Sequence, residues 1–259
     1  MFKPNKTILA MIQPNPLPGS YRHEDETINE IVKQVLEEVK MIHDLGFDGV
    51  ILQNMNDMPV KQVANVEAVS FMTRIGLEIK KMYPDFVLGV LVNWDGVASL
   101  AVAEAIGADF IRVEHLFTGA SVTSAGILQA QCVEIANLRK RIKSKIPVYA
   151  DIFEVHGVPL GAKTLDNAAW EAVHEAFADG LFVSGKTAEE SIAMYQTVRS
   201  KLTQVPIFLG GGATGDNIHQ LMQFYDGVSV GTWVKDGDMK NQINKEKAAV
   251  FLSESKQNT

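Results

Sequence analysis

The chain has 259 residues, of which 46% are hydrophobic and 21% are charged, and its formal net charge is −7. This length and apolar content allow one large domain with a substantial core, because α/β barrels commonly take about 200–250 residues. The acidic balance argues against nucleic acid or an anionic membrane surface as the main partner.

Short runs of β-branched and apolar residues are typical of strands that are buried on both faces. The predicted strands cover residues 7–12, 49–53, 87–92, 110–113, 147–151, 181–184, 206–210 and 227–231. Longer segments carry apolar residues at spacings of three and four, which predicts amphipathic helices. The predicted helices cover residues 28–45, 66–82, 97–106, 126–142, 165–177, 188–202, 217–224 and 244–252.

Strand and helix alternate along the whole chain, which predicts a parallel sheet. Four segments share the form of a helix end, a turn with Asp and a following strand: LGFDGVIL, IGADFIRV, ADGLFVSG and YDGVSVGT. An open doubly wound sheet is the alternative, but its dinucleotide fingerprint is missing after the first strand, where QPNPLPGSYR stands. We therefore predict a single (β/α)8 TIM barrel domain over residues 1–259, with a frayed polar tail at 253–259.

Cysteine usage and the amino-terminal sequence bear on where the protein is found. Cys132 is the single cysteine, so a disulfide within the chain is impossible and a reducing compartment fits best. Neither a signal peptide nor an apolar run long enough to span a membrane is present. We expect a cytoplasmic protein, and we also expect a homo-oligomer.

Two glycine-rich turns follow the last two predicted strands, in FLGGGATGDN and GVSVGTWVK. Glycine lets the backbone approach an anion closely, and the loops after strands seven and eight form the phosphate site of many barrels. We expect Gly211, Gly212, Gly231 and Thr232 to donate hydrogen bonds to a phosphate group. The alternative is that residues 210–212 simply form a tight turn.

Acidic and imidazole side chains follow the fourth and fifth predicted strands. Glu114, Asp151 and His156 facing one pocket could perform acid–base chemistry or hold a divalent metal, although the sequence assigns no metal. Alternatively, Glu114 pairs with Arg112 and His156 packs within its loop. Asp151 is the preferred catalytic residue, because an acid at the end of an apolar strand is costly to place there without a use.

Other polar residues also follow predicted strands. Lys186, in LFVSGKT, could form a Schiff base with a carbonyl substrate, or it could be a solvated loop lysine or a phosphate contact. Asn93 and Arg112 lie at the ends of the third and fourth strands, and we assign them to substrate binding.

Several segments together resemble the BtpA family, also called BtpA/SgcQ, over almost the whole chain. They are PLPGS, LVNWDGVASLAVAEAIGADFIRVEHLFTGASVT, ADIFEVHGVPLG, VSGKT, LGGGATGDNI and VGTWVK. The resemblance implies a barrel of the ribulose-phosphate-binding type. It also implies that the family's recurring positions include the loop at 16–19, Asp57, Asp95, Arg112, residues 118–119, Asp151, His156, Gly211 and Gly231.

Two functions fit the sequence. The first is an enzyme that isomerises, epimerises or cleaves a small phosphorylated metabolite such as a sugar phosphate, with Asp151 or Glu114 moving the proton. The second is a non-catalytic biogenesis or stability factor, which the resemblance implies because one photosynthetic member of the family is implicated in photosystem I biogenesis. A barrel fold alone does not decide between them.

Overall fold

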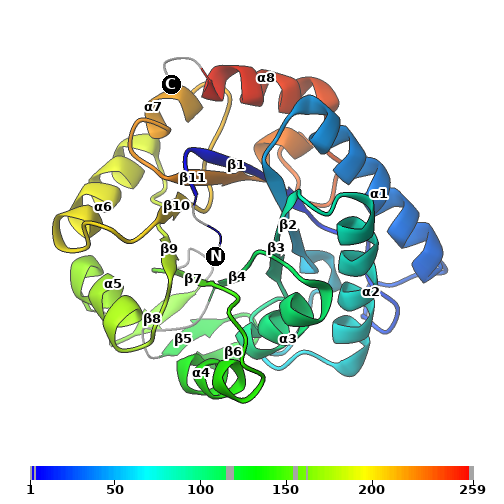
Figure 1. Ribbon diagram of the computed structural model, residues 1–259, viewed down its shortest axis with the longest axis horizontal. Coiled ribbons are helices and arrows are strands. Elements are labelled where there is room, and N and C mark those ends of the chain that lie inside the picture. Colours follow the sequence, from blue (N-terminus) through cyan, green and yellow to red (C-terminus); the bar gives the residue numbers. More distant parts are fainter. Residues whose placement is uncertain (1, 3, 115–119, 154–156, 162, 257–259) are drawn as a thin grey trace.

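Eight parallel strands close into a barrel in the computed structural model, which describes residues 2, 4–114, 120–153, 157–161 and 163–256 (Figure 1). The order around the barrel is β1-β11-β10-β9-β7-β4-β3-β2, so the strands follow one another in chain order. Their bounds are β1 Thr7–Ile12, β2 Gly49–Gln53, β3 Val87–Leu91, β4 Phe110–Val113, β7 Val148–Asp151, β9 Gly180–Phe182, β10 Ile207–Leu209 and β11 Gly227–Val230. The predicted strands are thereby confirmed.

Helices surround the barrel, and Figure 1 shows them as a ring outside the strands. Outward-facing apolar residues of the strands pack against the apolar sides of these helices in one continuous core. The helix bounds are α1 Ile28–Leu45, α2 Val66–Met82, α3 Gly96–Ile106, α4 Cys132–Arg141, α5 Leu165–His174, α6 Ala188–Lys201, α7 Ile218–Leu221 and α8 Lys245–Ser255. Short 3-10 turns lie at Met55–Asp57 and Trp233–Lys235.

Local sequence explains how α1 begins and ends. Thr27 and Glu30 form a capping box, in which each side chain accepts a hydrogen bond from the other residue's backbone N–H. Gly46 ends the helix with φ of 93°, a left-handed conformation that glycine adopts without strain. The next strand can therefore start immediately after the turn.

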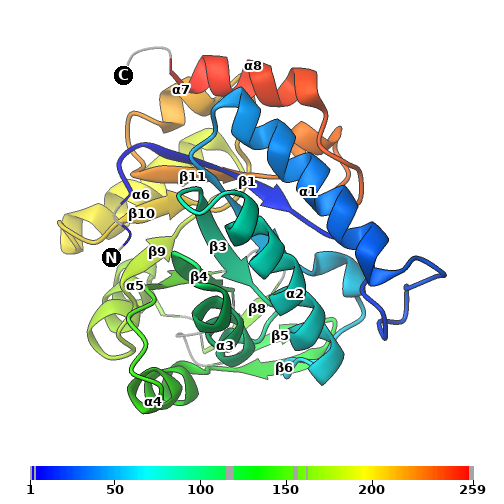
Figure 2. The ribbon, with the colours of Figure 1, turned by 45° about the vertical axis from the view of Figure 1, so that its right-hand side comes forward.

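The predicted helix over 126–142 is wrong in its first part. Residues Gly126–Gln129 form the strand β6, which pairs antiparallel with β5 (Ala120–Thr123), and α4 starts only at Cys132. Gly126 has φ of 97°, which turns the chain into a hairpin instead of a helix. A third strand, β8 (Val158–Leu160), joins β5, and Figure 2 shows this small sheet beside the barrel.

The barrel interior is filled by aromatic rings that face glycines. Three directly paired positions on neighbouring strands combine a ring with a glycine: Phe110 with Gly89, Tyr149 with Gly180, and Phe208 with Gly227. A Cβ atom added at Gly180 would lie 2.2 Å from the Tyr149 ring. Each ring therefore occupies the space that a neighbouring side chain would need.

The amino-terminal end of the barrel is closed by another ring. Phe2 stacks on Phe110 with 5.2 Å between the ring centroids, and it also contacts Tyr149 and Phe208. The amino-terminal half of the barrel is therefore a packed core, and space for a ligand has to be sought at the carboxyl ends of the strands.

We expect Gly180→Ala to lower the free energy of unfolding by about 1–3 kcal/mol, the usual cost of overpacking a core. The added methyl group has to displace the Tyr149 ring or the strand that carries it. Urea unfolding measures the change. Gly211→Ala is the matched control, because no atom lies within 4 Å of its added Cβ, and equal stability of the two variants would contradict this view of the core.

Candidate functional site

Polar side chains replace the apolar interior at the carboxyl ends of the strands. Side chains two positions apart on a strand face the same side, so each residue two positions after an interior apolar residue also faces inward. These inward positions are Gln13, Gln53, Asn93, Arg112, Asp151, Ser184 and Gly210. The mouth of the barrel is thus lined by polar groups that come from different strands.

Amide side chains form a chain along one side of this mouth. Gln13 Nε2 donates to Gln53 Oε1 at 3.2 Å, and Gln53 Nε2 donates to Asn93 Oδ1 at 3.0 Å and to Glu114 Oε1 at 3.4 Å. Asn54 holds Asn93 in place, because its side-chain oxygen accepts the Asn93 backbone N–H at 2.9 Å. Glu114 therefore lies beside the amides.

Gln13 has an oxygen without a hydrogen-bond partner in the described part of the chain. The side chain is 5% exposed, and its Oε1 atom is buried. A buried acceptor without a donor costs free energy, about 1–3 kcal/mol. A ligand that donates a hydrogen bond to this oxygen would therefore gain binding free energy.

Arg112 and Asp151 form a buried ion pair on the other side of the mouth. The guanidinium donates from Nε to one carboxylate oxygen at 2.9 Å and from Nη2 to the other at 2.8 Å. It also donates to the Gly210 carbonyl at 3.3 Å and lies over the Phe182 ring at 4.4 Å. The sequence offered Glu114 as a partner for Arg112, whereas the structure pairs Arg112 with Asp151.

The two glycine turns lie side by side, because β10 and β11 are hydrogen-bonded neighbours. Gly210 N–H donates to Ser184 Oγ at 2.8 Å, and the Gly210 carbonyl accepts from Ser229 Oγ at 3.4 Å. Gly212 has φ of 78°, which requires glycine, and the space beside Gly211 is open.

Backbone donors remain available in these turns. Within the described residues, the amides of Gly211, Gly212 and Thr232 donate no hydrogen bond to the protein. Gly231 lies close to Met11 and Met239, and a Cβ atom there would meet Met239 Sδ at 2.9 Å. The corner next to the Arg112–Asp151 pair therefore offers donors without protein acceptors.

The remaining predicted site residues are not among the inward-facing side chains that the structure describes at the mouth. Lys186 is exposed, and its backbone N–H donates to Glu190 at 2.7 Å. His156 and residues 118–119 lie outside the described residues. Asp95 caps α3 by accepting from the backbone N–H groups of Val97 and Ala98, so its role in the structure is at a helix end.

A cavity of about 330 Å³ lies between the first two strand-to-helix loops. Its lining includes Leu17, Asn54, Asp57 and Asn93. Asp57 accepts from the Leu17 backbone at 2.7 Å and from Asn54 Nδ2 at 2.8 Å, and burial raises the pKa of its carboxyl group. The cavity shares Asn93 with the amide chain and extends the mouth toward the 16–19 loop.

A strained residue follows the amide chain directly. Trp94 has φ of 56° and is 7% exposed. Bulky residues rarely adopt this conformation, and such strain concentrates at functional sites. The conformation turns the chain sharply between Asn93 in the mouth and the Asp95 cap of α3.

Lys235 is a feature that the sequence analysis missed. It follows β11 and is 1% exposed, and burial lowers the pKa of its amine while the nearby Glu38 opposes that shift. Burial also raises the pKa of Glu38, which Lys235 opposes in turn. A buried lysine and an exposed lysine look alike in sequence, so the burial of Lys235 is seen only in the structure.

Within the described ranges, no three His, Cys, Asp or Glu side chains converge as metal ligands would. Over the same ranges, no helix combines the length and the apolar character that crossing a membrane requires.

Comparisons with known proteins match the sequence over nearly its whole length. A family model described as the BtpA family matches residues 4–257. An uncharacterized protein of Methanocaldococcus jannaschii is 32% identical over 256 residues, which cover 98% of this chain and 96% of the relative. The Photosystem I biogenesis protein BtpA of Synechocystis is 28% identical, with 97% of this chain and 88% of the relative covered. The sgc region protein SgcQ of Escherichia coli is 26% identical, with 95% and 93% covered.

Solved structures with the same fold bear names that refer to phosphorylated compounds. The N-(5'-phosphoribosyl)anthranilate isomerase from Pyrococcus furiosus has a TM-score of 0.56 at 15% identity, covering 97% of this chain and 99% of that one. The 3-hexulose-6-phosphate synthase from Salmonella typhimurium has a TM-score of 0.55 at 15% identity, covering 98% and 100%. At such identities the likeness shows the fold alone, and the predicted (β/α)8 TIM barrel is confirmed.

We expect Arg112→Met to destabilise the protein by about 3–5 kcal/mol, because it leaves the Asp151 carboxylate buried without its cation. Thermal and urea unfolding measure the loss, and Arg112→Met with Asp151→Leu should recover much of it. Arg139→Met is the matched control, since the Arg139–Asp179 pair is partly exposed and should contribute only about 0–1 kcal/mol. An equal loss for both single variants would contradict the buried pair.

We expect Lys235→Met to destabilise the protein, because the partly buried Glu38 carboxylate then loses the positive charge that opposes the effect of burial on its pKa. Without the lysine charge, the pKa of Glu38 rises further. The loss should therefore be largest at neutral pH and should shrink as the pH falls and Glu38 takes up a proton. Urea unfolding at several pH values tests this, with the exposed Lys240→Met as control. A loss that does not change with pH would contradict the coupling.

Proposed function

The chain belongs to the BtpA family, and we propose that it is an enzyme that isomerises, epimerises or cleaves a small phosphorylated, hydroxyl-bearing metabolite. The observation that carries this proposal is the pair of adjacent glycine turns after β10 and β11, with amides that have no acceptor among the described residues. The solved neighbours named for phosphorylated substrates support it at the level of fold.

The phosphate group would be held by backbone donors. The amides of Gly211, Gly212 and Thr232 can converge on an oxyanion, in the way that consecutive free amides do in other anion sites. The open space beside Gly211 lets the phosphate approach the backbone closely. Binding energy from this remote group can then support the chemistry at the reacting carbon.

The other end of the substrate would lie against the amide chain. Gln13 offers its unpartnered oxygen to a hydroxyl group, and Gln53 and Asn93 supply both donors and acceptors. These side chains are neutral, so they can bind hydroxyl and carbonyl groups of the substrate. They do not require the substrate to carry a charge at this end. This arrangement favours a sugar-like metabolite over a purely apolar one.

Glu114 is the residue to which we assign proton transfer. Its hydrogen bond from Gln53 is long, at 3.4 Å, and the side chain is only partly buried. In an isomerisation, the carboxylate takes a proton from the carbon next to the carbonyl, and the bonding electrons move to the carbonyl oxygen. The proton then returns to the former carbonyl carbon, while the proton of the adjacent hydroxyl group passes to the former carbonyl oxygen. In an epimerisation, a second group gives a proton to the opposite face of the same carbon.

Asp151 is assigned to positioning, because both of its oxygens accept hydrogen bonds from Arg112. The fixed guanidinium can stabilise the negative charge that develops on the substrate oxygen. Lys186 is kept as a phosphate contact from the loop after β9, and His156 as a second proton-transfer group. A divalent metal is not required by this scheme.

The small sheet next to the barrel favours a second function. Directly paired residues share a face, so Val122, Ile127 and Val158 lie together, and Leu160 lies on the same face two positions further along β8. All four are exposed, which makes this face suited to binding another protein. As the alternative proposal, the chain acts as a biogenesis factor, as the name of the Synechocystis relative indicates for that protein. A homo-oligomer could bury the same face.

We expect sugar phosphates to raise the melting temperature of the protein, because a ligand that binds the native state stabilises it. The measurement is a thermal-shift screen of sugar phosphates against the corresponding unphosphorylated sugars. Gly211→Ala should weaken binding by about tenfold or more, equivalent to about 1.4 kcal/mol, because its methyl group occupies the space that the phosphate needs.

The stability of Gly211→Ala without ligand serves as the internal control, since its added Cβ meets no other atom. Stabilisation by the unphosphorylated sugars alone would contradict the phosphate site. An absence of stabilisation by any sugar phosphate would favour the alternative function, whereas self-association lost in Val122→Ser and Ile127→Ser would assign the face of the small sheet to a homo-oligomer.

A further inference from the structure

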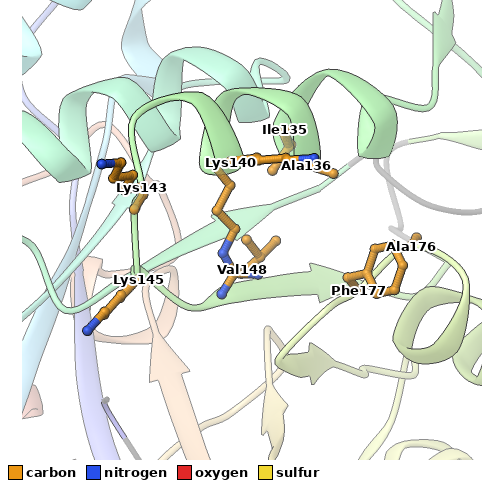
Figure 3. Close-up of a pocket in the computed structure, with 10 residues that line it drawn as sticks. Ile135, Ala136, Lys140, Lys143, Lys145, Val148, Ala176 and Phe177 are labelled. Carbon is orange, nitrogen blue, oxygen red and sulfur yellow. The ribbon is translucent and has the colours of Figure 1, made fainter.

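A groove of about 480 Å³ lies on the outside of the barrel, between α4 and the end of α5 (Figure 3). Val148, the first residue of β7, lines it, so the groove lies at the end of that strand opposite to the mouth. Among the described residues, α4 packs extensively on α3 and α5 on α6, but no comparable contact joins α4 to α5. The helices α4 and α5 are therefore neighbours in the ring that do not pack closely against each other.

The groove combines an apolar lining with uncompensated positive charge. Lys140, Lys143 and Lys145 line it and are exposed, and none has an ion-pair partner among the described residues. Arg139 also lines it but is neutralised by Asp179 at 2.8 Å. Interaction with the α4 dipole can account for Lys140, in the last turn, but Lys143 and Lys145 lie beyond the end of the helix.

Two residues that line the groove adopt a conformation that favours glycine. Lys143 has φ of 56° and Phe177 has φ of 60°, and both lie in turns between a helix and a strand. The corresponding turns after α1 and α3 use Gly46 and Gly107. Strained residues that persist where glycine would fit often serve a function. Phe177 is in addition 63% exposed, so its ring is not retained for the core.

The size of the groove indicates the kind of ligand. Small-molecule sites commonly measure about 300–1,000 Å³, and the volume of this groove, about 480 Å³, falls within that range. Figure 3 shows Phe177 on one side of the groove and Lys143 and Lys145 toward the other, with Lys140 reaching from α4 toward Val148. The arrangement is that of an apolar floor with cations at its border, in a chain whose net charge is −7.

We propose that this groove binds a small organic anion with an apolar or aromatic body. The body packs on Phe177, Ile135 and Val148, and the anionic group lies among the three lysines. The site is separate from the mouth of the barrel, and the proposal does not rest on the function assigned to that mouth.

Fluorescence titration with anilinonaphthalene sulfonate, an aromatic anion, tests the proposal on the full-length protein. Phenylnaphthylamine, which lacks the sulfonate, should bind at least about tenfold more weakly, a factor that corresponds to about 1.4 kcal/mol. Lys140→Glu with Lys145→Glu should weaken sulfonate binding by a similar factor. The pair Lys81→Glu and Lys240→Glu has the same charge change on exposed lysines elsewhere and should leave binding unchanged.

Phe177→Gly separates a role in binding from a role in folding. Glycine accepts a φ of 60° without strain, so the melting temperature should not fall, while sulfonate binding should weaken about tenfold. Gly211→Ala should leave the signal unchanged, because it acts at the mouth. Equal binding of the uncharged probe, loss in the control pair, or loss in Gly211→Ala would each overturn the proposal.

Discussion

The pairing of aromatic rings with glycines inside the barrel is the constraint on which the rest of the structure depends. Phe110, Tyr149 and Phe208 each face a glycine at the directly paired position of a neighbouring strand. Because the three rings fill the amino-terminal half, the register of the strands is fixed by volume as well as by hydrogen bonds. One step of slippage would turn the side chains of the shifted strand to the other face and take its ring out of the barrel interior.

That register also decides what faces the mouth. Two residues beyond Phe110 and Tyr149, the same strands carry Arg112 and Asp151, so the rule that places the rings also brings the two charges within hydrogen-bond distance. Gly210, two residues beyond Phe208, leaves room for the guanidinium, since a Cβ atom there would lie 2.9 Å from Arg112 Nη2. The same strand register therefore determines which side chains face inward in the packed half of the barrel and in its polar half.

The sequence predicted the barrel because hydrophobic periodicity and Gly-Asp turns are local signals, and the glycine turns after β10 and β11 could be located for the same reason. The partner of Arg112 could not be predicted, since Glu114 is nearer in sequence and only the closed barrel brings Asp151 alongside. The β5–β6 hairpin was missed because the apolar residues in Gly126–Gln129 also fit a helical spacing. Burial of Lys235 depends on contacts between distant segments and leaves no local pattern.

The edges of the small sheet beside the barrel are closed to further strands. On the outer side of β6, the Gln62 side chain accepts the Gln129 N–H at 3.0 Å and donates to the Gln129 carbonyl, as the peptide group of a neighbouring strand would. On the outer side, β8 carries Pro159, which has no N–H to donate. The edges of β6 and β8 are therefore protected against pairing with a strand of another molecule, which is how exposed edge strands usually aggregate. Any protein that docks here has to lie flat across the strands, with its specificity set by side-chain shape instead of by main-chain pairing.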